Sequence, residues 1–451
     1  MSAMTNTLPG SGTFARGVHP PERKGLSGPK AIEVLPTPKQ VAIPLLQHTG
    51  APCEPAVKPR DAVALGQVIG TSQAFISAPV HASVAGVAQM GSVATLPNGR
   101  HVKTVPIKAE GAQLEGEALL VDVFGGDWPT QGLHTHEPKA IAQAVRDAGI
   151  VGLGGAAFPT SVKFARNEAK PVDVLLVNGC ECEPYLTADY RLMMEYPAPI
   201  VTGALLAAHA AGAKRVVIAI EDNKRDAAEK VRAAAGGTHV EVAVLHTKYP
   251  MGGERQTILA ALKREVPTGG LPLDVGVVVI NVGTAAAVAR AVLRGKPLTH
   301  RVVSVTGAGV REPKNLLVPV GVSYGELIDF CGGLTDDAAR IVAGGPMMGF
   351  TLADLSTPVT KGTSGVTVLT RDDVRRAEQT NCVRCGRCVD VCPLRLVPTK
   401  MAMAAKFRDW ELAKRYHLQA CCECGCCGYA CPASIPLVQL IRLGKAQIPK
   451  E

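Results

Sequence analysis

The C-terminal part of the chain contains two related stretches, NCVRCGRCVDVCP at residues 381–393 and CCECGCCGYACP at residues 421–432. Both contain the spacing C-x2-C-x2-C-x3-C-P, which is typical of cysteines that bind [4Fe–4S] clusters. Two-residue gaps let three thiolates reach one cubane, while the cysteine after the three-residue gap ligates the other cluster. We therefore predict two [4Fe–4S] centres with crossed ligation. The first has the ligands Cys382, Cys385, Cys388 and Cys431, and the second has Cys421, Cys424, Cys427 and Cys392.

Two other interpretations of these cysteines are weaker. Structural zinc usually takes two separated pairs of ligands rather than a run of four. Disulfides need an oxidising compartment, and residues 1–12 lack the basic region and the apolar stretch of a signal peptide. Cys422 and Cys426 are extra thiols in the second run, but either one would break the spacing as a ligand, so both are left out of the predicted sets.

The composition is that of a soluble or peripheral protein with several domains. A length of 451 residues predicts about three domains, and 47% hydrophobic but only 4% aromatic residues are typical of compact α/β units. The longest uncharged apolar run, between Asp274 and Arg290, contains Asn281 and Gly283 and is too short to cross a bilayer as a helix.

The net charge of +9 does not indicate nucleic-acid binding. Residues 371–451 contain 14 Lys and Arg against 8 Asp and Glu, a net charge of +6. Two oxidised clusters with their thiolates carry about −2 each and offset about 4 of these charges. A basic shell around the clusters explains the composition, and the remaining positive field is compatible with an acidic electron-transfer partner.

The N-terminal part is expected to be an extended arm, residues 1–30, followed by a β-rich domain at residues 31–110. The sequence from Val57 to Gln67 resembles a lipoyl/biotinyl-type barrel-sandwich domain. Its central turn has no lysine where those carriers attach a prosthetic group, so we interpret the domain as structural. The predicted strands are Gln40–Leu46, Gln67–Gly70, Phe75–Pro79 and Ser83–Met90.

The middle of the chain, residues 135–299, alternates between helical and β-rich segments and predicts a layered α/β domain. Residues 300–350 resemble the SLBB-type β-grasp module of respiratory NADH dehydrogenases. Residues 351–374 are expected to be a linker, and residues 375–451 a helical two-cluster ferredoxin domain with a helix over Lys400–Gln419. The fold class is therefore multidomain, α/β and α+β. In the α/β domain the predicted helices are Ala140–Ala148, Ser161–Glu168, Lys224–Ala235, Gln256–Lys263 and Thr284–Leu293, and the predicted strands are Val172–Asn178, Arg215–Ile220, Val240–Leu245 and Gly276–Val282.

A second candidate site begins with the glycine-rich loop Ile150–Thr160, which opens a helix that contains Lys163. Such a loop lets backbone N–H groups approach a phosphate. Two β-rich runs end at Asn178 and Asn281, and ligands of α/β sheets bind at strand ends. The order G-x-G-G-A-x-F-P-T-x-x-K, N-G-x-E-x-E-P and N-V-x-T resembles the FMN- and NADH-binding subunit of respiratory complex I.

This resemblance implies roles for individual residues. FMN would be surrounded by Gly152, Gly154, Gly155, Lys163, Asn178, Glu181, Asn281 and Thr284, and NAD(H), the substrate, would contact Phe158, Glu183 and Glu254. The sequence departs from the complex I pattern at four positions. Leu153 stands where that family has Arg, Ala157 where it has Gly, and Cys180 and Cys182 where it has Asp and Ser. Cys180 and Cys182 are too close in sequence for a relaxed disulfide, so we expect them to be packed or to line the site.

The whole chain resembles one narrower family, RnfC, the C subunit of the Rnf-type ion-translocating ferredoxin:NAD oxidoreductase. The motifs that carry this resemblance are G-V-H-P-P-E at 17–22, E-P-Y-L-T-A-D at 183–189, G-P-M-M-G at 345–349 and the paired cysteine runs. The resemblance implies a peripheral subunit on the cytoplasmic face of the cell membrane. Its partners would be the membrane and ferredoxin-like subunits of a complex that moves Na+ or H+, and ferredoxin indirectly.

Two alternatives come from other classes of protein. A cobalamin reductase shares the flavin and cluster motifs, but its flavin loop lies near the N-terminus, whereas about 150 residues precede the loop here. An electron-relay scaffold without flavin would keep the cysteines, but Lys163, Asn178 and Asn281 argue against it.

Overall fold

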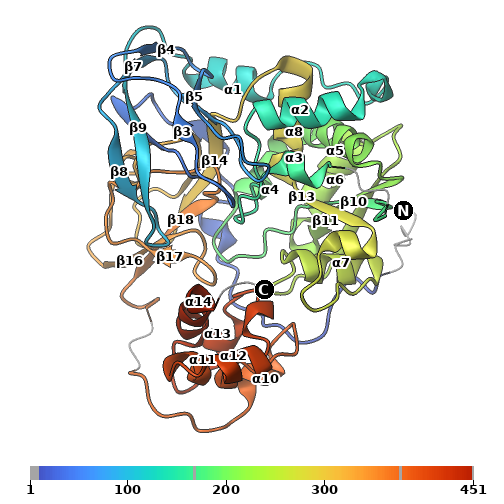
Figure 1. Ribbon diagram of the computed structural model, residues 1–451, viewed down its shortest axis with the longest axis vertical. Helices are drawn as coiled ribbons and strands as arrows, with labels where there is room; N and C mark the ends of the chain where they lie inside the picture. The colour runs from blue at the N-terminus through green and yellow to red at the C-terminus, as the bar shows by residue number, and fades with distance from the viewer. Residues whose placement is uncertain (1–9, 166–168, 375–377, 449–451) are drawn as a thin grey trace.

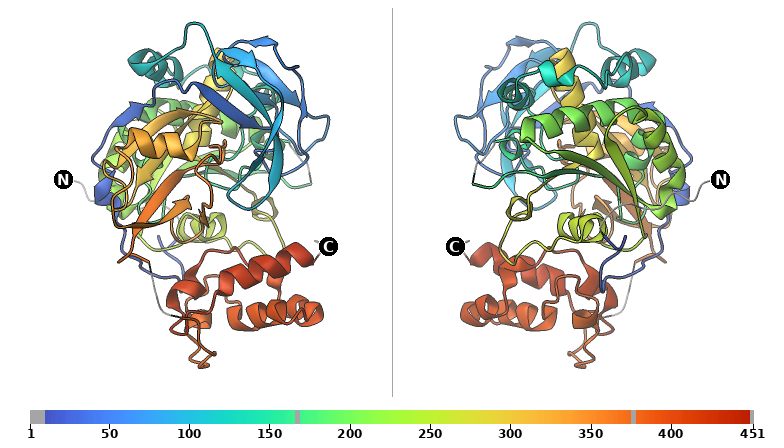
Figure 2. Two further views of the ribbon diagram at one scale, coloured as in Figure 1. Left: turned by 90° about the vertical axis from the view of Figure 1, so that its left-hand side faces the viewer. Right: turned by 90° about the vertical axis from the view of Figure 1, so that its right-hand side faces the viewer.

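A computed structural model of the chain describes residues 10–165, 169–374 and 378–448 (Figure 1). It contains a β-rich N-terminal unit, an α/β domain, a mixed six-stranded sheet and a small helical module that holds the cysteine runs. The helical module lies as a separate layer below the other three (Figure 2).

The N-terminal unit consists of two small antiparallel sheets with apolar side chains between them, including Val41, Ile43 and Ile69. The segment Phe75–Pro79, predicted as a strand, is instead part of the loop before β6, and Phe75 is 63% exposed. One sheet contains β2 (Gln40–Pro44), β9 (His101–Ala109), β7 (Gly86–Ala88), β4 (Ala62–Val63) and β8 (Ser92–Thr95), and the other contains β3 (Glu54–Pro55), β5 (Val68–Thr71) and β6 (Val80–His81).

The α/β domain is built on a four-stranded parallel sheet of order β12-β11-β10-β13. Its strands are apolar runs, as expected for parallel strands covered on both faces. From β10 the chain adds β11 and β12 on one side and then crosses back to add β13 on the other side of β10. The strand order therefore reverses between β10 and β13, and open α/β sheets bind ligands at such a point. The strands are β10 (Val174–Asn178), β11 (Arg215–Glu221), β12 (Val240–Leu245) and β13 (Val277–Asn281).

The predicted helices of this domain are present with small shifts in their ends. The predicted helix Ser161–Glu168 is shorter, because α3 ends at Lys163; residues 166–168 lie outside the described residues. Three helices were missed: α1 (Gly116–Phe124), α4 (Ala188–Glu195) and α5 (Pro197–Ala211). α5 is buried around almost its whole circumference, so it has no amphipathic period to reveal it. The predicted helices are α2 (Pro138–Asp147), α3 (Thr160–Lys163), α6 (Arg225–Ala234), α7 (Glu254–Leu262) and α8 (Val282–Arg294).

The six-stranded sheet has the order β1-β15-β14-β18-β16-β17, and α9 (Tyr324–Phe330) packs on it. Two predicted boundaries are wrong here. β1 (Ile32–Val34) pairs in parallel with β15 and so does not belong to the barrel-sandwich unit. Residues 351–374 are not a linker, because the apolar segment Gly365–Thr370 forms the buried strand β18 between β14 and β16. The other strands are β14 (His300–Thr306), β15 (Lys314–Pro319), β16 (Ala338–Ala343) and β17 (Phe350–Thr351).

The C-terminal module consists of short helices around a small apolar core. The predicted helix Lys400–Gln419 is two helices, because Arg408 has a left-handed backbone (φ 57°) between α11 and α12. Gly444 lets α14 approach α11, since a Cβ there would lie 2.9 Å from Cβ of Ala405. The helices are α10 (Arg387–Asp390), α11 (Pro398–Lys406), α12 (Trp410–Arg415), α13 (Cys426–Ala430) and α14 (Leu437–Gln447).

The described part of the N-terminal arm is extended, as expected, but it is bound along its length. The amide of Gly10 donates to the carbonyl of Ala261, and Val18 forms an antiparallel bridge with Tyr249. The amide of Gly17 donates to the carbonyl of Val391 in the helical module. The arm therefore connects the α/β domain to the cysteine runs.

Among the helices of the described ranges, none combines the length and the apolar composition that a membrane span needs.

Candidate functional site

The glycine-rich loop forms a bare backbone surface beside the carboxyl edge of the parallel sheet. The amide of Gly152 donates to the carbonyl of Phe158 (2.8 Å), which closes the loop, and residues 154–156 are exposed. Gly155 has φ 105°, and a Cβ at this residue would meet open space. The amide of Leu153 donates to Oγ1 of Thr284 (2.9 Å), so the loop lies against the start of α8. This geometry leaves room for a phosphate beside backbone amides.

The barrel-sandwich unit supports the loop from outside the α/β domain. The backbone N–H of Thr49 donates to the carbonyl of Ala157, and its hydroxyl donates to the carbonyl of Ala156, both at 3.1 Å. The buried amine of Lys361 donates to the carbonyls of Pro79 (2.7 Å) and Gly149 (2.8 Å), and burial lowers the pKa of Lys361 to about 7. Both ends of the loop are thus held by other modules.

The two asparagines that end β10 and β13 are paired in register at the point where the strand order reverses. Oδ1 of Asn178 accepts from the amide of Cys180 (3.0 Å), and Nδ2 donates to the carbonyl of Gly252 (2.8 Å). Oδ1 of Asn281 caps α8 by accepting from the amide of Gly283 (2.8 Å), and Nδ2 donates to Asp189 (2.6 Å). Each amide nitrogen retains one N–H for a ligand.

A buried charge cluster lies behind these strand ends. Burial, and next the charge of Glu181, raises the pKa of Asp189 to about 7, while Arg301 opposes the rise. The guanidinium of Arg301 donates to the carbonyl of Leu153 (3.2 Å) and so also holds the glycine loop. Glu181 accepts from the amides of Asp189 (2.8 Å) and Tyr190 (3.1 Å) at the start of α4. The carboxylate of Glu181 therefore holds the start of α4, the helix that carries Asp189.

The predicted phosphate-binding lysine lies under the end of β13. Nζ of Lys163 donates to the carbonyl of Val279 (2.8 Å) and keeps two N–H groups for another acceptor. Burial lowers the pKa of Lys163, and the charge of Glu254 opposes this shift. Glu254 is exposed at the start of α7, and Phe158 is half-buried at the end of the glycine loop. An open amide loop, a lysine and strand-end amides at one sheet edge fit a ligand with a phosphate and a planar polar ring.

Glu183 lies in the loop between β10 and α4, residues 179–187, which also contains Glu181. Its carboxylate accepts from the amides of Met347 (3.1 Å) and Met348 (2.7 Å), and burial raises its pKa to about 7. Its polar contacts therefore go to the segment 345–349 next to the helical module, rather than to the glycine loop. Cys180 is fully buried in the core below β10, and burial raises the pKa of its thiol.

A lysine of the N-terminal arm holds this loop in place. Nζ of Lys24 donates to the carbonyls of Glu181 (2.8 Å), Glu183 (3.1 Å) and Leu186 (2.6 Å), and burial lowers the pKa of Lys24. All three N–H groups of the ammonium are used. Glu181 (φ 43°) and Tyr185 (φ 71°) have left-handed backbones, which side chains other than glycine rarely adopt. Lys24 stabilises this unusual conformation.

Lys24→Met should therefore lower both the thermal stability and the flavin affinity of the chain. It leaves three partly buried carbonyls without their charged donor, and each such hydrogen bond contributes about 1.5–3 kcal/mol. We expect FMN to bind at least about tenfold more weakly, equivalent to about 1.4 kcal/mol, as measured by flavin fluorescence. The exposed Lys30 of the same arm provides the control Lys30→Met. Unchanged flavin affinity in Lys24→Met would contradict the role of Lys24.

The thiols of the two cysteine runs interleave in the helical module. Burial raises the pKa of Cys388, and the thiols of Cys431, Cys382 and Cys385 raise it further, so these four lie together. Burial raises the pKa of Cys427, and the charges of the Cys421, Cys392 and Cys388 thiols raise it further, in that order. Three thiols of the predicted second set thus interact with one another, and Cys392 from the first run is one of them. The thiol of Cys424, the fourth predicted ligand, instead interacts with those of Cys422 and Cys426.

Single-metal sites are absent from the described residues, where no three His, Cys, Asp or Glu side chains could hold one ion. A [4Fe–4S] cluster differs from a single ion because it spreads its four thiolate ligands over four iron atoms. Amides point at two of the sulfurs: that of Leu396 donates to Cys392 (3.4 Å) and that of Glu423 to Cys421 (3.3 Å). Such hydrogen bonds tune the reduction potential of a cluster.

The second cysteine set faces the α/β domain, whereas the first faces solvent. The hydroxyl of Tyr249 donates to the carbonyl of Cys424 (2.6 Å) within a buried contact. Val18, Tyr249, Cys424 and Cys426 form an apolar cluster, and Cys182 packs against it. Since Cys182 lies in the loop that begins at Asn178, one loop connects the strand-end site to the second cysteine set.

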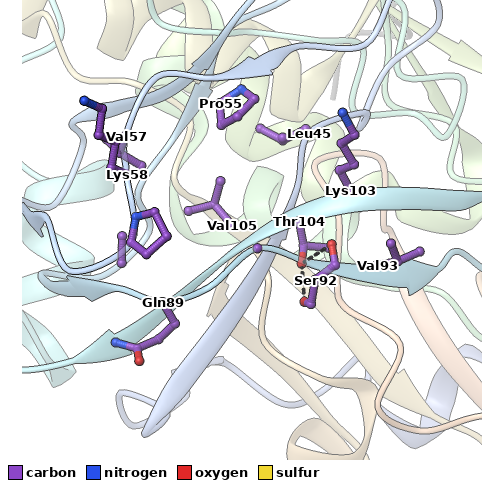
Figure 3. Close-up of a pocket in the computed structure, with 13 residues that line it drawn as sticks. Leu45, Pro55, Val57, Lys58, Gln89, Ser92, Val93, Lys103, Thr104 and Val105 are labelled. Atoms are coloured by element: carbon purple, nitrogen blue, oxygen red, sulfur yellow. Dashed lines mark hydrogen bonds between the residues drawn. The ribbon is translucent and has the colours of Figure 1, made fainter.

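A cavity of about 330 Å³ in the barrel-sandwich unit is separate from these sites (Figure 3). Its lining comes from that unit alone and includes Leu45, Val57 and Val105, with Lys58 and Lys103 at its rim. None of the predicted flavin or cluster residues contributes to it.

Comparison with known proteins agrees with this geometry. Residues 145–290 match the family model of the Nuo51 FMN-binding domain, residues 12–112 that of the RnfC barrel sandwich hybrid domain, and residues 302–351 that of the SLBB domain. The C subunit of the proton-translocating ferredoxin:NAD(+) oxidoreductase complex of Clostridium ljungdahlii is 41% identical over 442 residues, which cover 96% of this chain and 94% of that protein. The Na(+)-translocating counterpart of Acetobacterium woodii is 42% identical over 438 residues, 97% of each chain.

The chain belongs to the RnfC family. Its match to the RnfC relatives spans all four modules, and the predicted barrel-sandwich, FMN-binding and SLBB-type units are confirmed. The C subunit of the ion-translocating oxidoreductase complex of Rhodobacter capsulatus is 40% identical over 436 residues, which cover 96% of this chain and 82% of that protein. The order of the matched units places the flavin unit of this RnfC chain between its barrel-sandwich and SLBB units.

Proposed function

We propose that this chain is the subunit in which NAD(H) exchanges hydride with FMN and from which single electrons pass through two [4Fe–4S] clusters. It would act as a peripheral, cytoplasmic-side subunit of a membrane-bound complex that couples this exchange to movement of Na+ or H+. The membrane and ferredoxin-like subunits of that complex would be its partners. One observation carries the proposal: the loop that begins at the strand-end residue Asn178 also contacts the second cysteine set through Cys182.

The residues of the chain have distinct tasks in this function. Lys163 and the amides of the glycine loop would hold the FMN phosphate, while Asn178 and Asn281 would orient the ring with their free N–H groups. Lys24, Asp189 and Arg301 keep the loops in place. When bound, FMN supplies the conversion between two-electron hydride transfer and single-electron transfer through the clusters.

The relatives support the partner and the coupling by their names, which describe C subunits of ferredoxin:NAD(+) oxidoreductase complexes that translocate protons or Na+. A cobalamin reductase is the less favoured alternative, because the match extends through the barrel-sandwich unit that precedes the flavin loop. The scaffold without flavin is less favoured because residues 145–290 match an FMN-binding domain.

Anaerobic purification followed by titration with NADH tests the function. We expect one FMN and about eight iron atoms per chain, as two [4Fe–4S] clusters require. NADH should bleach the flavin absorbance and then produce the electron paramagnetic resonance signals of reduced clusters. A folded chain with clusters but without FMN would instead support the relay scaffold, and a flavin that NADH does not reduce would refute the nicotinamide step.

A further inference from the structure

The loop before α10 is the exposed end of the predicted electron path. Every residue from 378 to 387 is exposed, including Cys382 and Cys385 of the first set. This loop runs along the side of the helical module that faces away from the α/β domain (Figure 1). Cys424, Cys426 and Cys427 of the second run are buried instead. A partner protein can therefore approach the first cysteine set, through Cys382 and Cys385, more closely than the second.

Basic side chains surround this exposed set. Arg384 lies in the loop and Arg387 is the first residue of α10. Lys400 follows Thr399, whose hydroxyl is 3.8 Å from the thiol of Cys382. None of these three basic groups has an ion-pair partner within the described part of the chain. Two exposed acids, Glu378 and Asp390, flank them.

The second set has a different electrostatic arrangement. There Arg442 and Lys445 both pair with Glu423, at 2.9 and 2.8 Å, and the pairs are largely buried. These two basic groups, which α14 places beside the second run, are thus used within the chain. Those of the first set remain available to a partner.

One exposed apolar side chain lies next to the arginines. Val383 is 65% exposed and lies directly beside Arg384. A small apolar centre with arginines around it is typical of protein interfaces, in which arginine is enriched and pairs with carboxylates through two hydrogen bonds. Because two clusters offset about 4 of the six excess positive charges of the module, recognition would depend on close contacts rather than on a long-range field.

We propose that residues 378–387 form the docking surface for an acidic protein that carries one electron, and that electrons enter and leave this chain at the first cysteine set. The proposal rests on the proposed function, since it requires clusters at both sets. Each transfer oxidises the donor centre by one electron and reduces the acceptor by one, with no bond formed and no proton moved. Carboxylates of the partner would pair with Arg384 and Arg387.

Binding to the chain with its cofactors in place tests this proposal without turnover. The probe is a purified acidic two-cluster ferredoxin, and calorimetry measures its dissociation constant at low and at physiological salt. Arg384→Glu and Arg387→Glu should each weaken binding roughly tenfold, because each change replaces an attraction by a repulsion at the contact. Arg408→Glu is the matched control, since Arg408 is also exposed and follows the far end of α11, whose first turn contains Thr399.

Each outcome has a defined meaning. Equal weakening by all three variants would overturn the proposal in favour of non-specific attraction. Loss of binding to phosphatidylserine vesicles, together with unchanged ferredoxin binding, would assign the loop to a membrane surface instead. Cluster spectra, iron content and flavin bleaching by NADH should be the same in all variants. If wild-type chain lacks those signals, the proposed function fails; if it has them and Arg384→Glu binds ferredoxin normally, only the docking proposal fails.

Discussion

Cys392→Ser should remove the second [4Fe–4S] centre and leave the first one intact. Cys392 lies in the first run, but its thiol is a neighbour of Cys421 and Cys427 from the second run. A serine hydroxyl is a poor replacement for a thiolate, so the iron content should fall from about eight to about four atoms per chain. Because the second centre is the one next to the flavin domain, reduction of the first centre by NADH should stop as well.

Electron paramagnetic resonance of chemically reduced variants distinguishes the two possible ligand sets. Cys388→Ser is the matched comparison, since Cys388 is in the same run but neighbours Cys431, Cys382 and Cys385. It should remove the first centre and keep the second. If Cys388→Ser and Cys392→Ser abolish the same signal, ligation is not crossed.

Lys163→Met should produce the second large effect, a loss of bound FMN. Methionine keeps most of the length of the side chain but removes the ammonium group that would neutralise the phosphate. A charge-assisted hydrogen bond contributes about 1.5–3 kcal/mol, so the affinity should fall by roughly 10- to 150-fold. Methionine is preferable to glutamate, because the amine of Lys163 is buried against the carbonyl of Val279 and a carboxylate there would be repelled even without FMN.

Flavin content after gel filtration and equilibrium titration with FMN measure this effect. Lys170→Met is the control, since Lys170 lies near the same segment but is half exposed and pairs with Asp274 (2.6 Å). Both variants should keep the circular dichroism spectrum of the wild type. A Lys163→Met protein with normal FMN affinity would show that the amine holds β13 rather than the phosphate.

Local spacing in the sequence predicted the modules well. The strand β12 begins and ends at the predicted residues, and Asn178 and Asn281 lie at the strand ends where the pattern placed them. The domain boundaries were predicted wrongly where strand pairing joins distant segments or where the composition resembles a linker. The pairing of β1 with β15 joins residues almost 300 positions apart, and the short apolar segment of β18 is surrounded by Ser, Thr and Gly that resemble a linker.

The functional site was predicted less completely than the fold. The residues predicted to face the cofactor follow family motifs, but the groups that support them come from other modules. Thr49, Lys24 and Arg301 reach the site from the barrel-sandwich unit, the arm and the six-stranded sheet, and no spacing rule connects them to the glycine loop. Two of the supporting residues could have been suspected from the sequence. Lys24 follows the family motif H-P-P-E by two residues, and Asp189 is the last residue of the family motif E-P-Y-L-T-A-D.

The two bonds from Thr49 to the glycine loop have a thermodynamic consequence for the N-terminal unit. Any ligand that orders Ala156 and Ala157 also favours the conformation in which the barrel-sandwich unit is docked, and docking favours the ligand by the same factor. The unit has no lysine in its central turn for a prosthetic group, yet this reciprocal coupling would let it contribute to cofactor affinity. We therefore expect FMN to slow amide hydrogen exchange in the barrel-sandwich unit around Thr49.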